Sequence, residues 1–136
     1  MIRAETSGIG QDHMNLMQAT LYGILIWAPP APFGCHATKD PHVAMCSNDK
    51  AIREFADGTL EYDSKYTVKM DRRRNPVFST GITAHFDSFG WLQFSNGYAL
   101  RRMEGNVFKV SLPNSNGADI TCRYTDPDRQ TSCTPG

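Results

Sequence analysis

Apolar and polar residues alternate along most of the chain beyond residue 52. The alternation is clearest in 66–70, 82–86, 107–112 and 120–124, where every second residue is apolar. A period of two is typical of a strand that buries one face and exposes the other. The pattern therefore predicts a series of short antiparallel strands joined by tight turns.

The Asn-Gly pair in the stretch WLQFSNGYALRRM marks one of these turns. A two-residue loop there would put the apolar side chains of the two strands on opposite faces. A three-residue loop pairs Phe94 with Tyr98 and Leu92 with Leu100, and it requires Gly97 to be left-handed. Matching of the apolar faces therefore favours the longer loop.

An Asp-Gly pair marks a second turn, between REFA and TLEY. Asp57 and Gly58 tolerate the positive φ angles of a two-residue hairpin, which would pair Phe55 with Leu60. A short helix over 48–57 with Gly58 as its cap is the alternative interpretation.

The expected fold is mainly β. An antiparallel meander closes as a small barrel or folds over as a sandwich, and the barrel is favoured because closure removes edge strands that promote aggregation. No internal repeat with a solenoid period is evident. With 136 residues, the chain is long enough for a single modest core.

The N-terminal third differs from the rest. Residues from Met14 to Ala28 are almost free of charge and lead into PPAPFG, which must end any helix. One interpretation is that 1–37 form an export signal and a proline-rich linker before a single β-rich domain, 38–136. The other is a core helix capped by Asp12. The apolar centre is too short to span a bilayer.

Four cysteines, at positions 35, 46, 122 and 133, form two segments in which ten residues separate the pair. Local bridges, Cys35–Cys46 and Cys122–Cys133, would staple two loops, each containing Asp-Pro. Removal of a signal after Ala37 would favour a Cys46–Cys122 bridge instead, and a Cys35–Cys133 bridge is a further possibility.

Zinc is the competing interpretation of the first segment, with His36 and His42 as additional ligands. Structural zinc sites mostly space their cysteines two to four residues apart, so disulfides are favoured and no metal or cofactor is expected. Disulfides predict a secreted or periplasmic protein, whereas four free thiols would place it in the cytoplasm.

Little in the sequence points to catalysis. Lysine plus arginine and aspartate plus glutamate are both 14, so the formal net charge is zero. Phosphate loops, dinucleotide fingerprints and nucleophile elbows are missing from the sequence. His85 and Asp87 share the solvent face of one strand, which leaves a small hydrolase as the least favoured hypothesis.

A binding role is the leading interpretation. Arg72, Arg73 and Arg74 form the one basic cluster, to which Arg101 and Trp91 could add. The sequence predicts a non-enzymatic, exported module that binds a protein or surface partner, as an inhibitor or immunity protein does. An intracellular protein that binds nucleic acid or an acidic surface through the arginines is the alternative.

The general plan of residues 46–125 is similar to that of small exported β-barrel inhibitors such as the periplasmic lysozyme inhibitors. The similarity rests on the expected strands and on the cysteine positions. It implies a fold and an exported setting. The serine-rich loop motif of those inhibitors does not occur in PNSNG, so no residue role is transferred.

Overall fold

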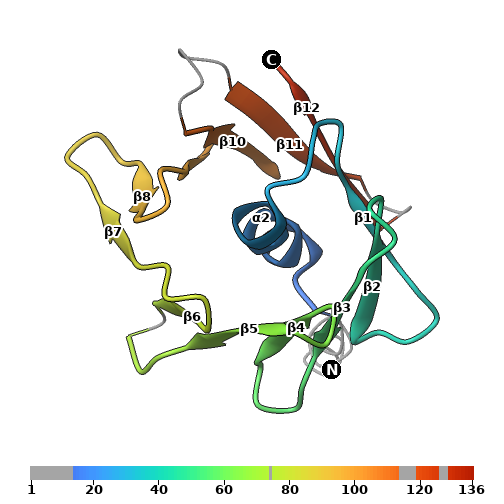
Figure 1. Cartoon of the computed structure of the whole chain (residues 1–136). Helices are drawn as coiled ribbons and strands as arrows, with labels where there is room; N and C mark the ends of the chain where they lie inside the picture. Colours follow the sequence, from blue (N-terminus) through green and yellow to red (C-terminus); the bar gives the residue numbers. More distant parts are fainter. Residues whose placement is uncertain (1–13, 74, 114–118, 126–128) are drawn as a thin grey trace, which may run out of the picture.

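The computed structural model describes residues 14–73, 75–113, 119–125 and 129–136. One helix, α2 (Leu16–Trp27), lies inside a ring of twelve antiparallel strands (Figure 1). The strands are β1 (Cys35–Ala37), β2 (Val43–Cys46), β3 (Ala51–Glu54), β4 (Leu60–Tyr62), β5 (Tyr66–Met70), β6 (Pro76–Phe78), β7 (Ala84–Phe86), β8 (Leu92–Phe94), β9 (Ala99–Arg102), β10 (Val107–Ser111), β11 (Asp119–Thr125) and β12 (Gln130–Pro135).

Strand order confirms the predicted meander. The sheet runs β6-β5-β4-β3-β2-β1-β12-β11-β10-β9-β8-β7, so the pairing of the first strand, β1, with the last, β12, joins its two halves. The sheet is nearly closed and barrel-like, as expected from the alternation. It stays open between β6 and β7, which follow one another in the chain but are not paired.

The helix predicted within Met14–Ala28 is present, and it forms much of the core. Nine of its twelve residues are buried, as expected for a helix that is apolar on all sides. Its N-cap is Asn15, whose side chain accepts a hydrogen bond from the Gln18 backbone N–H at 3.0 Å. Asp12, the cap expected from the sequence, lies outside the described residues. Ala28 ends the helix in a left-handed conformation.

Turn registers test the two hairpin predictions. The three-residue loop is confirmed: Leu92 lies opposite Leu100, and Gly97 has a φ of 96°. The two-residue loop at Asp57-Gly58 is wrong by one position, because Leu60 lies opposite Glu54 rather than Phe55, and Tyr62 lies opposite Ile52. Ile52 and Tyr62 are both fully buried, so matching of apolar faces decides this register as well. The alternative helix over 48–57 is also wrong, since β3 occupies that region.

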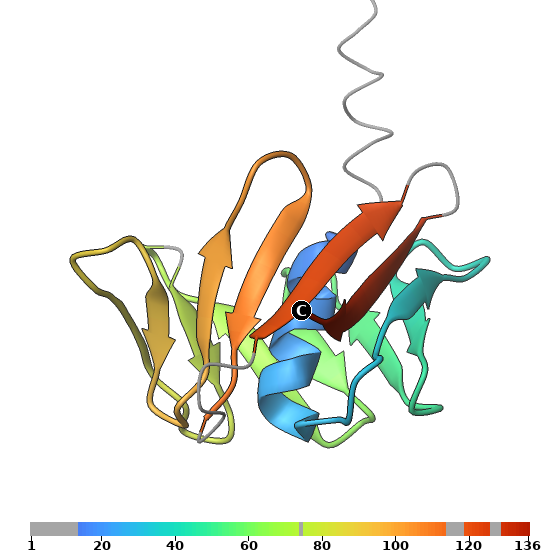
Figure 2. The same ribbon diagram turned by 90° about the horizontal axis from the view of Figure 1, so that it is seen from above.

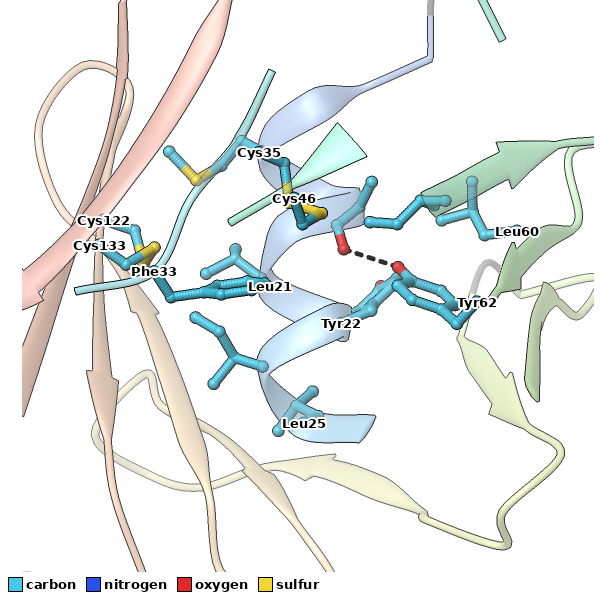
Figure 3. Close-up of a cluster of buried hydrophobic side chains, with 14 of the residues drawn as sticks. Leu21, Tyr22, Leu25, Phe33, Cys35, Cys46, Leu60, Tyr62, Cys122 and Cys133 are labelled. Carbon is cyan, nitrogen blue, oxygen red and sulfur yellow. Dashed lines mark hydrogen bonds between the residues drawn. A yellow bond between two sulfur atoms is a disulfide. The ribbon is translucent and has the colours of Figure 1, made fainter. Parts of the chain in front are cut away.

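Both cysteine segments form antiparallel strand pairs instead of open loops. Disulfides join Cys35 to Cys46 across β1 and β2, and Cys122 to Cys133 across β11 and β12 (Figure 3). These are the two local pairings considered from the sequence. They exclude the longer-range pairings and use all four thiols. The C-terminal polar segment is therefore ordered as β12.

A repeat of 16 residues builds most of the sheet, a period shorter than that of solenoid proteins. Its clearest sign is a buried residue near one rim of the sheet at every sixteenth position, namely Cys46, Tyr62, Phe78, Phe94 and Val110. The same rim repeats a serine hydrogen bond. Ser79 Oγ accepts from the Thr67 N–H at 2.9 Å, and Ser95 Oγ accepts from the Thr83 N–H at 2.9 Å. The repeat shares hydrophobic character more than residue identity, which hides it in the sequence.

Candidate functional site

A cavity of about 490 Å³ lies between α2 and β7–β10. We call β7–β10 the open wall, and β1–β4 with β11 and β12 the closed wall. Apolar side chains of the helix and of the open wall form most of the lining, namely Met17, Leu21, Tyr22, Phe86, Leu92, Leu100 and Phe108. Polar lining comes from Asn15, Gln18, Arg101, Arg102 and Asn106. A cavity of roughly 300–1,000 Å³ with an apolar body and a few polar groups is the usual form of a binding pocket.

The cavity exists because the helix is attached to the closed wall. The Tyr62 hydroxyl of β4 donates a 2.6 Å hydrogen bond to the Ala19 carbonyl, drawn as the dashed line in Figure 3. The hydroxyls of Thr20 and Thr131 lie 2.7 Å apart, which links the helix to β12. These buried polar contacts fix the N-terminal half of α2 against β4 and β12, and leave space in front of the open wall.

At the rim where α2 ends, the open wall does contact the helix. The Asn96 side chain donates a 3.2 Å hydrogen bond to the Leu25 carbonyl, in the last turn of α2. The rings of Phe78 and Phe94 meet edge to face with centroids 6.0 Å apart, and Tyr22 packs against Phe78 in the same way. The core is therefore filled at this end, and the cavity lies toward the rim of the 87–91 turn. Figure 2 shows the backbone alone from above, with the helix enclosed by the strands.

Positive charge without carboxylates characterises the cavity lining. Neither aspartate nor glutamate lines it, whereas Arg101 and Arg102 do. Within the described residues Arg102 has no ion pair. Burial raises the pKa of Tyr22, with a smaller opposing effect of a hydrogen bond to Gln18, so this phenol stays neutral. The cavity therefore suits a group that is apolar, with a negative charge at its edge.

Two exposed phenylalanines border the cavity. Phe86 is 72% exposed and Phe89 is 77% exposed, the highest values among the large apolar side chains of the described residues. Phe89 occupies a turn position that is Arg73 in the preceding repeat. An aromatic ring thus lies where the preceding repeat has a charged residue, at a place that faces water. Contiguous exposed apolar surface is typical of interaction sites.

The 87–91 turn holds Phe89 in a defined position. Asp87 Oδ1 accepts hydrogen bonds from the backbone N–H groups of Phe89 at 2.8 Å and Trp91 at 3.0 Å. Its Oδ2 accepts from the Gln93 amide at 3.0 Å. The Gln93 hydrogen bond, with the two backbone donors, lowers the pKa of Asp87 below that of a free carboxyl. A turn braced in this way costs little further entropy on binding.

Of the predicted binding residues, Trp91 and Arg101 come together. The Arg101 guanidinium lies 5.8 Å from the centre of the Trp91 ring, a cation–π contact that holds the side chain near the cavity. Arg72 and Arg73 lie in the exposed β5–β6 turn, from which β9 is separated by β7 and β8. Arg74 lies outside the described residues. The predicted basic cluster is therefore divided between two hairpins.

The hydrolase hypothesis gains no geometric support. His85 is exposed on β7, and the Asp87 carboxylate is engaged by the turn and by Gln93, with no hydrogen bond to His85 among the described residues. His42, considered as a zinc ligand, instead contacts Glu54 through Nδ1 at 3.0 Å. No cluster of three or more potential metal ligands occurs in the described ranges.

The cavity itself was not predicted from the sequence. Phe86 was expected on the buried face of a strand, and Phe89 lies in a stretch that reads as a turn. An apolar residue inside FDSFGW, where turn chemistry favours polar residues, was the available signal. Arg102 lies two residues after Leu100, so the two share one face of β9, but the sequence did not show that this face was open.

Comparison with known proteins identifies no family and no relative. No protein-family profile matches the chain, and no significant match was found among curated proteins or solved structures. Helices in the described part of the chain are all too short or too polar to cross a membrane.

Proposed function

We propose that this protein is a non-enzymatic binding module that holds a protein partner at the open rim of its barrel. The observation that carries the proposal is the cavity between α2 and the open wall, bordered by Phe86 and Phe89. An apolar side chain of the partner fills the cavity, and an acidic group next to it pairs with Arg102. Aromatic and arginine residues around a desolvated pocket are the usual centre of a protein interface.

The module works in an oxidising compartment. Support comes from the two disulfides, which use every cysteine of the chain. They link β1 to β2 and β11 to β12, on either side of the pairing between β1 and β12. An inhibitor or immunity role fits such a module, because a small rigid protein with one exposed aromatic site can block a partner without doing chemistry.

A photo-crosslinking amino acid at position 89 tests the site. Purified protein is irradiated with the extracellular or periplasmic fraction of the producing cell, and adducts are identified by mass spectrometry. Phe55 gives a matched control, since it is also an exposed phenylalanine, at 40%, but belongs to the β3–β4 turn. We expect a discrete protein adduct from position 89 that is absent from position 55 and is lost with Arg102→Glu.

Equal adducts from both positions would contradict the proposed site. Adducts with small molecules alone would contradict a protein partner. An adduct that forms only with cytosolic extract, and is competed by nucleic acid, would move the function to the intracellular alternative.

A further inference from the structure

The ring of strands is open at one place, between β6 and β7. These strands follow one another in the chain, and the tight turn between them is formed, because the Gly81 N–H donates to the Phe78 carbonyl at 3.0 Å. The next hairpin of the repeat has the same turn bond, from Gly97 to Phe94. There the ladder continues into paired strands, β8 with β9, whereas β6 and β7 do not pair.

Pro76 removes one ladder donor on the β6 side of the opening. Ser79 N–H bonds to the Thr67 carbonyl of the neighbouring hairpin strand at 2.9 Å, so backbone groups of alternate residues, including Pro76, point away from β5 and into the opening. In the register of the repeat Pro76 would face Ala84, as Leu92 faces Leu100. Proline has no N–H to give, so the β6 edge cannot form this ladder bond.

The β7 edge keeps its donors. Thr83 accepts from the Ser95 N–H at 2.8 Å and Asp87 donates to the Trp91 carbonyl at 2.9 Å, so these alternate residues face β8. The backbone groups of Ala84 and Phe86 therefore point into the opening. Within the described part of the chain β7 pairs with β8 alone. The Phe86 side chain next to this edge lines the cavity.

We propose that the partner docks by adding a strand to β7. This inference rests on the proposed function and specifies how the same partner binds. Backbone N–H and C=O groups of Ala84 and Phe86 bond an extended, antiparallel segment, and alternate side chains of that segment enter the cavity beside Phe86. Main-chain bonds provide the affinity, and the cavity selects the side chain.

The repeat indicates which segment fits. In the repeats directly before and after β6, the strand at the corresponding position reads Leu60-Glu61-Tyr62 and Leu92-Gln93-Phe94. Leucine in the first position supplies the N–H that Pro76 lacks. A partner segment with the pattern apolar, any, aromatic therefore restores the ladder opposite β7.

Amide exchange with a synthetic peptide tests the proposal. The probe is an end-blocked peptide with the sequence of residues 58–62, GTLEY, and the control peptide carries proline in place of its leucine. In the free protein we expect the Ala84 and Phe86 amides to exchange fast, because they face the opening. With the leucine peptide we expect their exchange to slow by about tenfold, and with the proline peptide to stay unchanged.

A variant of the protein supplies the second arm. Pro76→Leu places at 76 the residue found at 60 and 92, so β6 can pair with β7 and close the ring. We expect protected Ala84 and Phe86 amides without any peptide, and loss of the partner adduct at position 89. Thermal unfolding checks that this variant is folded.

The outcomes separate the two proposals. Strand addition would be overturned if the Ala84 and Phe86 amides were already protected in the free wild type. It would also be overturned if the leucine peptide bound without protecting them. If the Pro76→Leu variant closes the ring and the adduct at position 89 persists, strand addition is refuted. The proposed binding site would then remain supported. Without any adduct in the wild type the proposed function itself fails, whatever the amides show.

Discussion

The open wall and β1–β4 of the closed wall follow the same 16-residue repeat, but the two walls relate differently to the helix. Tyr62, on the closed wall, donates its hydroxyl to the helix backbone, and burial raises its pKa well above that of an ordinary phenol. The corresponding residue of the open wall is Phe94, which is buried but has no hydroxyl to donate. One oxygen atom at a repeated position thus helps decide which wall holds the helix and which wall leaves a cavity.

The comparison also separates the stabilising contacts from the proposed binding surface. The closed wall contains both disulfides and the polar contacts to the N-terminal half of α2. The open wall contributes the most exposed phenylalanines and an arginine without an ion pair among the described residues. Concentrating stabilising contacts on one side lets the other keep exposed apolar surface, which would be a liability in a less stable fold.

Truncation of Tyr62 should have the largest effect. Tyr62→Ala removes a fully buried ring and its hydrogen bond, and we expect it to lower the free energy of unfolding by about 3–5 kcal/mol. Phe108→Ala removes a half-buried ring that lines the cavity, for an expected loss of about 1 kcal/mol. Urea denaturation measures both. Similar losses at the two positions would mean that the walls are equally packed.

The disulfides should rank next. Replacing Cys122 and Cys133 together by serine opens a short ring, and the chain-entropy model gives a loss of about 3 kcal/mol. Alkylation of the unreduced, denatured wild type should find no reactive thiol. If four thiols react, the bridges are absent, and the proposal that the protein works in an oxidising compartment is contradicted.

Glycines at equivalent turns provide a smaller, paired test. A Cβ on Gly97 would lie 2.8 Å from Pro113 Cβ, whereas at Gly81 it would meet nothing within 4 Å, and both glycines have positive φ. We expect Gly97→Val to cost more than about 1 kcal/mol, and Gly81→Val to cost less because backbone strain is its only source. Equal shifts of the urea midpoint would refute the contact at Pro113.

Acid titration should show the smallest effect. The pKa of Asp87 is lowered in the folded state, so its contribution to stability is present above the unfolded pKa and is lost as the pH falls through the folded value. Asp87→Asn should therefore unfold with a shallower dependence on pH in acid, as read from melting temperatures. An unchanged acid limb would show that the 87–91 turn does not depend on the carboxylate.

Local rules explain what the sequence could predict. The register at Gly97 followed from matching apolar faces, because both strands alternate without interruption. The register at Gly58 failed because turn type was given priority over burial of Ile52 and Tyr62. Strands β1, β2 and β12 were missed for different reasons. β2 is VAMC, which shows no alternation of apolar and polar residues, β1 has three residues only, and β12 is mostly polar. The pairing of β1 with β12, which are far apart in the sequence, supplies their order.

The cavity could not be predicted from local patterns. Its position depends on contacts such as that between Thr20 and Thr131, which are 111 residues apart in the chain. The opening of the ring was readable in principle, because Pro76 occupies a strand position and prolines in sheets belong to edges. Recognising it required the repeat, which shows that leucine occupies the same position in other hairpins.

Residue-resolved hydrogen exchange of the free protein tests most directly whether the two walls differ in how firmly they are held. We predict that amides of the β3–β4 ladder exchange only through global unfolding, and that amides of the β7–β8 ladder exchange through local opening at a lower free energy. Equal protection of both ladders would contradict the account, because an open wall held as firmly as the closed wall would have no separate role as the binding side.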